Sequence, residues 1–251
     1  MILLTNDDGF NAAGLRALRN EIAGVADVII VAPETEQSAV GHAITIASPL
    51  RVRKVVEGGD FLGYAVNGTP ADCVKIAITD ILEQLPNLVI SGINHGGNLG
   101  TCVIYSGTVS AATEAAIMGV PAMAVSLNDF SCDSFSPAAS FAHKLALLML
   151  EKGLPEGVSL NVNVPPVPAH EIKGVAVTRQ GKSRVIETFE KRIDPRKNTY
   201  YWMAGEMIFN EVEKETDFEM VSENYISVTP IHYDLTHLKA LEQLKDWNMR
   251  F

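Results

Sequence analysis

The sequence predicts an α/β protein in which helices cover both faces of a mostly parallel sheet. Short apolar runs alternate with helical segments over the first two thirds of the 251 residues, which is the rhythm of βαβ units. The run 28–32 is Val-Ile-Ile-Val-Ala, as expected of a parallel strand that is covered on both sides. The alternation ends near Leu160, after which a long charged and aromatic stretch follows.

The strands predicted for the core are 2–6, 28–32, 44–56, 61–66, 88–91, 122–126, 160–164 and 175–179. Segments 44–56 and 61–66 flank Glu57-Gly58-Gly59-Asp60, which indicates a hairpin. The strand 88–91 leads into a glycine-rich loop from Gly92 to Gly107. A last strand is predicted at 225–229.

Helices are predicted between these strands. The first covers about 12–23. Thr69 suits the N-cap and Pro70 the first helical position of the second. A third begins near Thr108 and ends before Gly119, where glycine and a following proline are typical of a helix end. The remaining helices are 137–153 and 238–247.

The chain therefore divides into a core at 1–179, an extended β-hairpin arm at 180–223, and a final strand and C-terminal helix at 224–251 that return to the core. The arm contains Tyr200-Tyr201-Trp202, and clustered aromatics on an extended hairpin are typical of an interface. We expect this arm to hold a homodimer or homotetramer together. The alternative is a small local core, since aromatic residues are often simply buried.

Composition excludes several classes of protein. Hydrophobic residues make up 47% and charged residues 20%, which is ordinary for a globular protein. The net charge of −10 argues against a nucleic-acid polymer as partner, although a small phosphorylated substrate remains possible. The cysteines are Cys73, Cys102 and Cys132, with no CxxC spacing, so we expect a reducing cytoplasm. Neither a signal peptide nor a bilayer-spanning run is present, so no membrane partner is expected.

Two adjacent carboxylates, Asp7 and Asp8, stand where the first strand should end, and Gly9 permits a sharp turn after them. In open α/β sheets, ligands bind just beyond the carboxyl ends of strands. Two acids there repel each other unless a cation neutralises them, and the expected cation is Mg²⁺ or Mn²⁺. The alternative is that Asp-Asp-Gly is ordinary turn chemistry.

Two loops could converge on these acids, because each follows a predicted strand. Loop 34–42 offers the Ser38 hydroxyl, for which an ordinary surface serine is the alternative. Loop 91–100 has more glycine and asparagine than a simple turn needs, and Asn94 and Asn98 supply neutral oxygen atoms. Its glycines let backbone donors approach an anion closely. The donors expected there are those near Gly96 and Gly97.

A third segment, Ser106-Gly107-Thr108, lies at a predicted helix start. Unpaired backbone N–H groups and the positive end of the helix dipole make such a start a seat for phosphate. Simple capping by Ser106 or Thr108 uses the same geometry, so the two interpretations do not exclude each other.

Taken in order, these segments resemble the SurE survival-protein family of metal-dependent 5′/3′-nucleotidases. The resemblance covers nearly the whole chain. The motifs that carry it are Thr5-Asn6-Asp7-Asp8-Gly9, Gly68-Thr69-Pro70-Ala71-Asp72-Cys73-Val74, Ser91-Gly92-Ile93-Asn94, Asn98-Leu99-Gly100, Tyr105-Ser106-Gly107-Thr108-Val109, Asp194-Pro195-Arg196, Tyr201-Trp202, Thr216-Asp217-Phe218 and Asp234-Leu235-Thr236.

The resemblance implies a Rossmann-like core, an oligomerisation arm and one divalent metal ion per subunit. It implies metal ligands at Asp7, Asp8, Ser38 and Asn94. The expected catalytic residues are Asp7 and Asp8, and the expected phosphate-binding residues are Asn94, Gly96, Gly97, Asn98, Ser106, Gly107 and Thr108. Ala39, Ala115 and Lys197 depart from the family, which often has glycine at these positions, and Ala39 is expected to affect the Ser38 loop.

The predicted function is hydrolysis of nucleoside monophosphates, at the 5′ and also the 3′ position, by a metal-dependent phosphomonoesterase. The alternative is a catalytically silent sensor that binds metal and nucleotide. A haloacid-dehalogenase-type phosphatase would need Asp-x-Asp after the first strand, and a dinucleotide-binding enzyme would need Gly-x-Gly-x-x-Gly. A P-loop at Gly181-Lys182-Ser183 would need its first glycine at Ala176.

Overall fold

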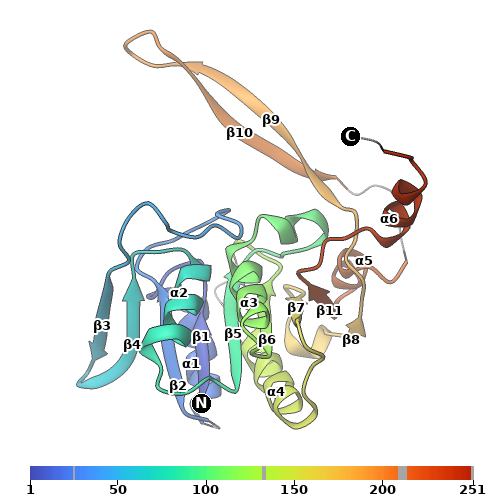
Figure 1. The fold of residues 1–251 in the computed structure, drawn as a ribbon. Helices are drawn as coiled ribbons and strands as arrows, with labels where there is room; N and C mark the ends of the chain where they lie inside the picture. Colours follow the sequence, from blue (N-terminus) through green and yellow to red (C-terminus); the bar gives the residue numbers. More distant parts are fainter. Residues whose placement is uncertain (25, 132–133, 209–213, 250–251) are drawn as a thin grey trace.

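One large sheet organises the part of the chain that the computed structural model describes, which is residues 1–24, 26–131, 134–208 and 214–249 (Figure 1). Its strand order is β3-β4-β2-β1-β5-β6-β7-β11-β8. The strands are β1 (Ile2–Thr5), β2 (Val28–Pro33), β3 (Val52–Glu57), β4 (Asp60–Val66), β5 (Leu88–His95), β6 (Ala122–Leu127), β7 (Val158–Val164), β8 (Gly174–Val177) and β11 (Tyr225–His232).

The centre of this sheet is parallel and contains a reversal of strand order. From β1 the chain adds β2 on one side and later adds β5 on the other, and both pair with β1 in parallel. The series continues in parallel through β6 to β7. Antiparallel pairing is found between β3 and β4 and between β7 and β11. In such a sheet the crevice for a ligand lies at the carboxyl ends beside the reversal, which here means β2, β1 and β5.

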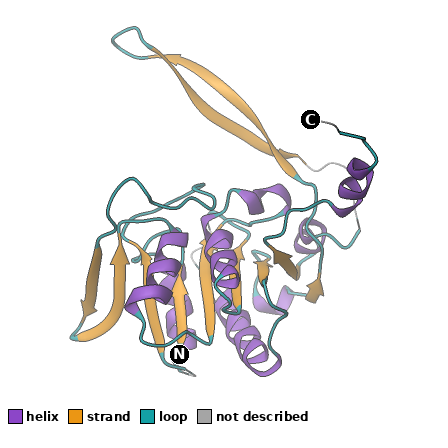
Figure 2. Cartoon of the chain, in the orientation of Figure 1, coloured by secondary structure: helices purple, strands orange, loops and turns teal. Residues whose placement is uncertain are grey.

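Helices cover both faces of the sheet, which confirms the predicted α/β fold class (Figure 2). One layer comprises α1 (Ala13–Ile22) and α4 (Ser136–Lys152), whose buried side chains pack with Ile2 and Leu4 of β1. The other layer comprises α2 (Pro70–Ile76) and α3 (Gly107–Ile117), which pack with Leu3 on the opposite side of the same strand. Successive residues of a buried strand thus belong to two separate apolar clusters, one on each face of the sheet.

Two segments differ from their predicted structure. Residues 44–51 are not strand, because Thr45 bonds through its backbone N–H and its hydroxyl to Asp72, at 2.9 and 2.6 Å, and not to a neighbouring strand. The predicted loop 92–107 is partly regular, since β5 continues to His95 and a 3₁₀ helix, η2, occupies Gly100–Ile104. The short π-helical turn η1 (Ala77–Ile81) and 3₁₀ turn η3 (Ala169–Glu171) complete the core.

The hairpin arm consists of β9 (Arg184–Ile193) and β10 (Thr199–Ile208), which pair antiparallel with each other. Among the described strands, neither pairs with any other strand. It rises from the side of the core where the parallel strands end (Figure 1). Residues 209–213 of the predicted arm lie outside the described part. The short helix α5 (Asp217–Ser222) packs on β11, so this end of segment 180–223 belongs to the core.

None of the residues of the C-terminal helix α6 (Leu238–Lys245) is buried. Cys73 and Cys102 are free thiols, and Cys132 lies outside the described residues. No helix in the described ranges combines the length and apolar character needed to cross a bilayer.

Candidate active site

The loops that follow β1, β2 and β5 meet at the predicted end of the sheet and surround a cavity of about 780 Å³. The Gln37 N–H donates to the Asp7 carbonyl oxygen at 2.7 Å, which holds the loop after β2 beside the loop after β1. The predicted site residues that line the cavity are Asp7, Asp8, Ser38, Asn94, Gly96, Gly97, Asn98 and Ser106. The strand reversal thus brings together residues that are far apart in the sequence.

Asp7 is held by the first turn of α3. The Thr108 hydroxyl donates to Asp7 Oδ1, and the backbone N–H dipoles of Gly107 and Thr108 favour the charged form of this carboxyl. Burial raises the pKa of Asp7, and these hydrogen bonds oppose that effect. The helix start predicted as a phosphate seat is therefore occupied by the Asp7 carboxylate. The physical reason is that this N-terminus binds whichever anion reaches it.

Asp8 is more exposed than Asp7 and faces the cavity. Burial and, after it, the negative charge of Asp7 raise the pKa of Asp8 to about 6. The charge and backbone N–H of His95 oppose this rise. Two carboxylates with raised pKa values in one cavity are the electrostatic situation that a bound cation relieves.

This electrostatic strain predicts a change in stability for Asp8→Asn. The pKa of the Asp8 carboxyl is about 6 in the folded protein, compared with its ordinary value of 3.8. The stability that this raised pKa contributes is fully present below pH 3.8 and is lost as the pH rises through about 6. We expect Asp8→Asn to raise the free energy of unfolding by about 1–2 kcal/mol near neutral pH in chelator, after allowance for partial exposure. Urea denaturation near pH 7.5 and pH 5 measures the gain, which should shrink at the lower pH. An equal gain at both would contradict the assignment.

Ser38 and Asn94 offer oxygen atoms to the same cavity. The Ser38 hydroxyl donates to Glu36, whose side chain also lines the cavity. The amide nitrogen of Asn94 donates to the carbonyl oxygens of His95 and Gly96, at 3.0 and 2.8 Å. Because both amide hydrogens are used, Oδ1 is the atom that Asn94 has available for a cation.

Several donors expected to bind phosphate are engaged within the protein. The Gly96 N–H donates to the Leu127 carbonyl oxygen at 2.9 Å. Asn98 donates through its backbone N–H to Asn163 and through Nδ2 to Ser126, each at 2.8 Å. These groups shape the loop after β5. Ser106 differs, because its oxygen only accepts from the Val109 N–H, and that bond leaves the hydroxyl proton available.

The loop that carries Ser38 is anchored below the cavity by a buried carboxylate. Glu114 of α3 accepts from His42 Nε2 at 2.7 Å and from Lys75 Nζ at 2.5 Å. Burial raises the pKa of Glu114, but these two partners outweigh it and hold the pKa below its usual value. The loop is therefore tied to α3 through His42 at one end and to the Asp7 carbonyl at the other.

The structure places residues at the cavity that the sequence analysis did not select. Phe130 follows β6 and is 85% exposed, although its ring stands against Gly96, where an added Cβ would lie 2.3 Å from the ring. Gly205 reaches the cavity from the arm, and Glu36 from the Ser38 loop. The sequence could have predicted Glu36 as a site residue, since it is an acid in a loop that follows a parallel strand. No feature of the sequence predicted Phe130 or Gly205 as site residues.

The donor set suits a hard divalent cation, with carboxylates from Asp7 and Asp8 and neutral oxygens from Ser38 and Asn94. It does not suit a metal that needs several nitrogen or sulfur ligands. Within the described ranges, no cluster of three or more His, Cys, Asp or Glu side chains is arranged to hold a metal. Two of these four groups are charged, and substrate and water would complete the shell of such an ion.

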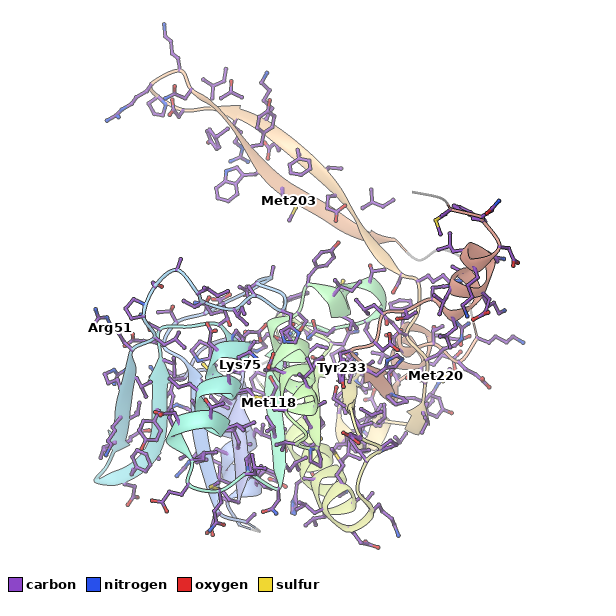
Figure 3. All side chains as sticks on the ribbon, viewed as in Figure 1. Arg51, Lys75, Met118, Met203, Met220 and Tyr233 are labelled. Carbon is purple, nitrogen blue, oxygen red and sulfur yellow. The ribbon has the colours of Figure 1, made fainter. Side chains whose placement is uncertain are left out.

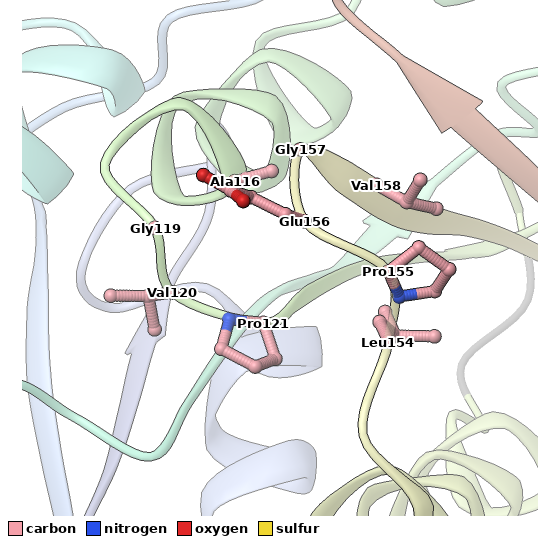
Figure 4. A pocket seen from close by; sticks show the side chains of 9 residues that line it. All are labelled: Ala116, Gly119, Val120, Pro121, Leu154, Pro155, Glu156, Gly157 and Val158. Carbon is pink, nitrogen blue, oxygen red and sulfur yellow. The ribbon is translucent and has the colours of Figure 1, made fainter.

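A second hollow lies at the opposite end of the sheet, where β6 and β7 begin (Figure 4). It is about 210 Å³ in volume, and Pro121, Leu154, Pro155 and Val158 contribute to its walls. Glu156 is its one ionisable lining residue among those described. The site of chemistry is therefore assigned to the carboxyl ends of the strands.

Comparison with known proteins agrees with this geometry. The model of the family described as "Survival protein SurE" matches residues 2–187. The chain belongs to the SurE family. A "5′-nucleotidase SurE" from Syntrophobacter fumaroxidans is 52% identical over 248 residues, with 99% of each chain covered. Another, from Syntrophus aciditrophicus, is 54% identical over 244 residues, covering 97% of this chain and 92% of that protein.

The SurE fold is also matched in three dimensions. The crystal structure of the SurE protein from Aquifex aeolicus aligns with a TM-score of 0.86 at 42% identity, covering 99% of both chains. Two departures of this chain from the SurE pattern have a visible structural consequence. Ala39 and Lys197 stand where the family often has glycine, and both adopt left-handed backbone, with φ of 55° and 66°. The Ser38 loop thus keeps a conformation that alanine adopts only at a cost.

Proposed function

We propose that this SurE protein is a 5′-nucleotidase, a metal-dependent phosphomonoesterase that hydrolyses nucleoside monophosphates to nucleoside and phosphate. The observation that carries the proposal is the pair of carboxylates, Asp7 and Asp8, in one cavity with the oxygens of Ser38 and Asn94. Relatives named 5′-nucleotidase SurE, about half identical over nearly the whole chain, support the same activity. Hydrolysis of 3′-nucleotides is part of the proposal.

The residues divide the work as follows. Asp7, Asp8, Ser38 and Asn94 hold the metal ion, with Mg²⁺ or Mn²⁺ preferred by their oxygen chemistry. Such an ion, when bound, supplies Lewis acidity toward the phosphoryl group and makes a water molecule more acidic. Thr108 and Gly107 orient Asp7 from the helix start.

Fewer residues are proposed to bind phosphate than the sequence predicted. Ser106 donates its hydroxyl to a phosphate oxygen, and Gly97 lets the backbone approach it. Asp8, which faces the cavity, accepts a proton from the attacking water. A polyanion is disfavoured as substrate by the net charge of −10, and a reducing cytoplasm remains the expected compartment.

Phosphate release from a panel of nucleoside monophosphates tests the proposal. The panel includes 5′-AMP, 3′-AMP and a phosphodiester, each with Mg²⁺, with Mn²⁺ and in excess chelator. We expect turnover of the monoesters that depends on metal and is absent in chelator. Tight nucleotide binding without phosphate release would favour the sensor, and equal rates on the diester would contradict a monoesterase.

The arm supports a homodimer or homotetramer as the working form. Within one subunit its large side chains are uncovered, with Phe189 66%, Tyr201 57% and Trp202 59% exposed. A two-stranded hairpin cannot bury both of its faces alone. Helix α6 adds Leu238 and Leu241, which are 69% and 43% exposed at a spacing that puts them on one side of the helix. A symmetry-related subunit would cover such surfaces.

Shortening the arm is expected to reduce the oligomer mass. Phe189 and Met203 are paired in the register, so an Asn-Gly turn can join them in place of residues 190–202. This design keeps the root of the arm against the core. Sedimentation velocity compares it with Tyr201→Thr/Trp202→Ser, which keeps the full strand length but removes aromatic surface. A folded protein of unchanged mass in both cases would place the subunit contact elsewhere.

A further inference from the structure

A second cavity, of about 790 Å³, adjoins the cavity of the catalytic acids. Ala39, Cys102 and Tyr105 contribute to the walls of both. The remainder of its wall comes from η2 on one side and from the root of the arm, through Ile186, Glu187 and Met203, on the other. The arm therefore closes one side of this cavity as well as projecting away from the core.

The chemistry of this cavity differs from that of its neighbour. Ile104, Tyr105 and Met203 contribute large apolar side chains and remain 67%, 60% and 67% exposed. Met203 lies on the part of the arm that passes over the core (Figure 3). An aromatic ring beside aliphatic and thioether groups is a favourable lining for a flat heteroaromatic ring. Glu187 adds one carboxylate, which accepts hydrogen bonds and donates none when ionised.

The walls of the cavity are fixed to one another by hydrogen bonds. Thr101 donates through its backbone N–H and its hydroxyl to the Ser183 carbonyl oxygen, each at 3.0 Å. Gln180 Nε2 donates to the Gly100 carbonyl oxygen at 2.8 Å, which ties η2 to the root of the arm a second time. The Gly41 N–H donates to the Tyr105 carbonyl oxygen at 3.0 Å and joins the Ser38 loop to the same wall. The cavity is thus largely formed before a ligand enters.

Its position relative to the catalytic cavity suits a particular occupant. Tyr105, shared by the two cavities, directly precedes Ser106, the N-cap residue of α3. A ligand that places a phosphate group near Ser106 can therefore extend past Tyr105 into the apolar cavity. A nucleoside monophosphate has this shape, with an anionic group and a flat base at opposite ends of a ribose.

We propose that this cavity is the nucleobase subsite and that Glu187 selects among bases; the proposal rests on the nucleotidase function proposed above. The base lies among Tyr105, Ile104 and Met203, and its edge faces the Glu187 carboxylate. Guanine presents two adjacent N–H donors that match a carboxylate in bidentate fashion. Uracil presents a single N–H donor between two carbonyl acceptors, which a carboxylate disfavours. The order of preference is therefore guanine first and uracil last.

The test compares substrates with and without a base. The substrates are GMP, UMP and ribose 5-phosphate, assayed with the full-length protein and saturating Mg²⁺ or Mn²⁺. Met203→Ala should raise KM for both nucleotides by about fivefold to tenfold and leave ribose 5-phosphate within about twofold. Glu187→Gln should reduce the preference for GMP over UMP by about tenfold, since an amide both donates and accepts.

Leu85→Ala is the matched control, because Leu85 is also a large apolar residue, is 62% exposed and lines neither cavity. It should leave the KM values unchanged. Sedimentation of every variant separates a local effect from loss of the oligomer.

Three outcomes would overturn the subsite. The first is an equal change in KM for ribose 5-phosphate and for the nucleotides. The second is an unchanged nucleotide KM in both Met203→Ala and Glu187→Gln. The third is a KM change that appears only when the oligomer mass falls. The last would make the cavity a contact between subunits. A wild-type protein that hydrolyses ribose 5-phosphate but neither nucleotide would contradict the proposed function itself.

Discussion

Asp7→Asn is expected to lower kcat/KM for nucleoside monophosphates by about 10³-fold or more. The substitution removes a charge from the pair that the metal requires. It also places an amide group where the Thr108 hydroxyl donates to the Asp7 carboxylate and where the N–H groups of Gly107 and Thr108 favour a negative charge. Donors would face donors at a buried position, so both metal affinity and the geometry of the helix start are affected.

Phosphate-release kinetics across a metal titration measure this effect. Asp27→Asn is the matched control, because it removes the same charge from an exposed position. Calorimetry with Mn²⁺ should show weakened binding by the Asp7 variant and unchanged binding by the control. Retention of near-parental kcat/KM by Asp7→Asn would remove Asp7 from the metal shell.

Gly107→Ala is expected to produce the second-largest loss, of about 10²-fold in kcat/KM, with a stability loss of about 1–3 kcal/mol. A Cβ at this position would lie 2.8 Å from Asp7 Cβ and 2.9 Å from Asp7 Oδ2. Asp7 or the start of α3 must therefore move. This glycine is needed for close approach between the helix start and the carboxylate.

Gly24→Ala provides the control, since an added Cβ there meets no atom within 4 Å. Kinetics and urea denaturation should show little change for that variant. If Gly107→Ala changed kcat/KM and stability as little as Gly24→Ala, the close contact between α3 and Asp7 would not be needed for activity.

The arrangement of layers could be predicted because it depends on local patterns. The run at β2 is apolar throughout, and a strand covered on both faces buries most of it, with only Val28 and Ile29 partly exposed. Segment 44–51 was mispredicted for the opposite reason. Its apolar and β-branched residues favour a strand, but Thr45 bonds to Asp72 of α2 and the Arg51 N–H to the Asn67 side chain, and both partners are distant in sequence.

The role of Thr108 shows a similar limit within the site. A Ser-Gly-Thr sequence at a helix start identifies an anion seat, but it does not identify the anion. The fold puts the Asp7 carboxylate there, so Thr108 positions an acid. Gly96 and Asn98 likewise support the loop through Leu127 and Asn163, which lie on strands that come later in the chain.

The sequence by itself determined which segments form the sheet, and it identified an acid pair, a serine loop and a glycine-rich loop as groups for one site. These properties follow from apolar periodicity and from the chemistry of short motifs, which are local. Only the tertiary structure decided that β2, β1 and β5 are neighbours, that Asp7 occupies the helix start, and that the root of the arm walls a second cavity. The physical reason is that a pattern records whether a side chain is buried, whereas its partners depend on how distant segments pack.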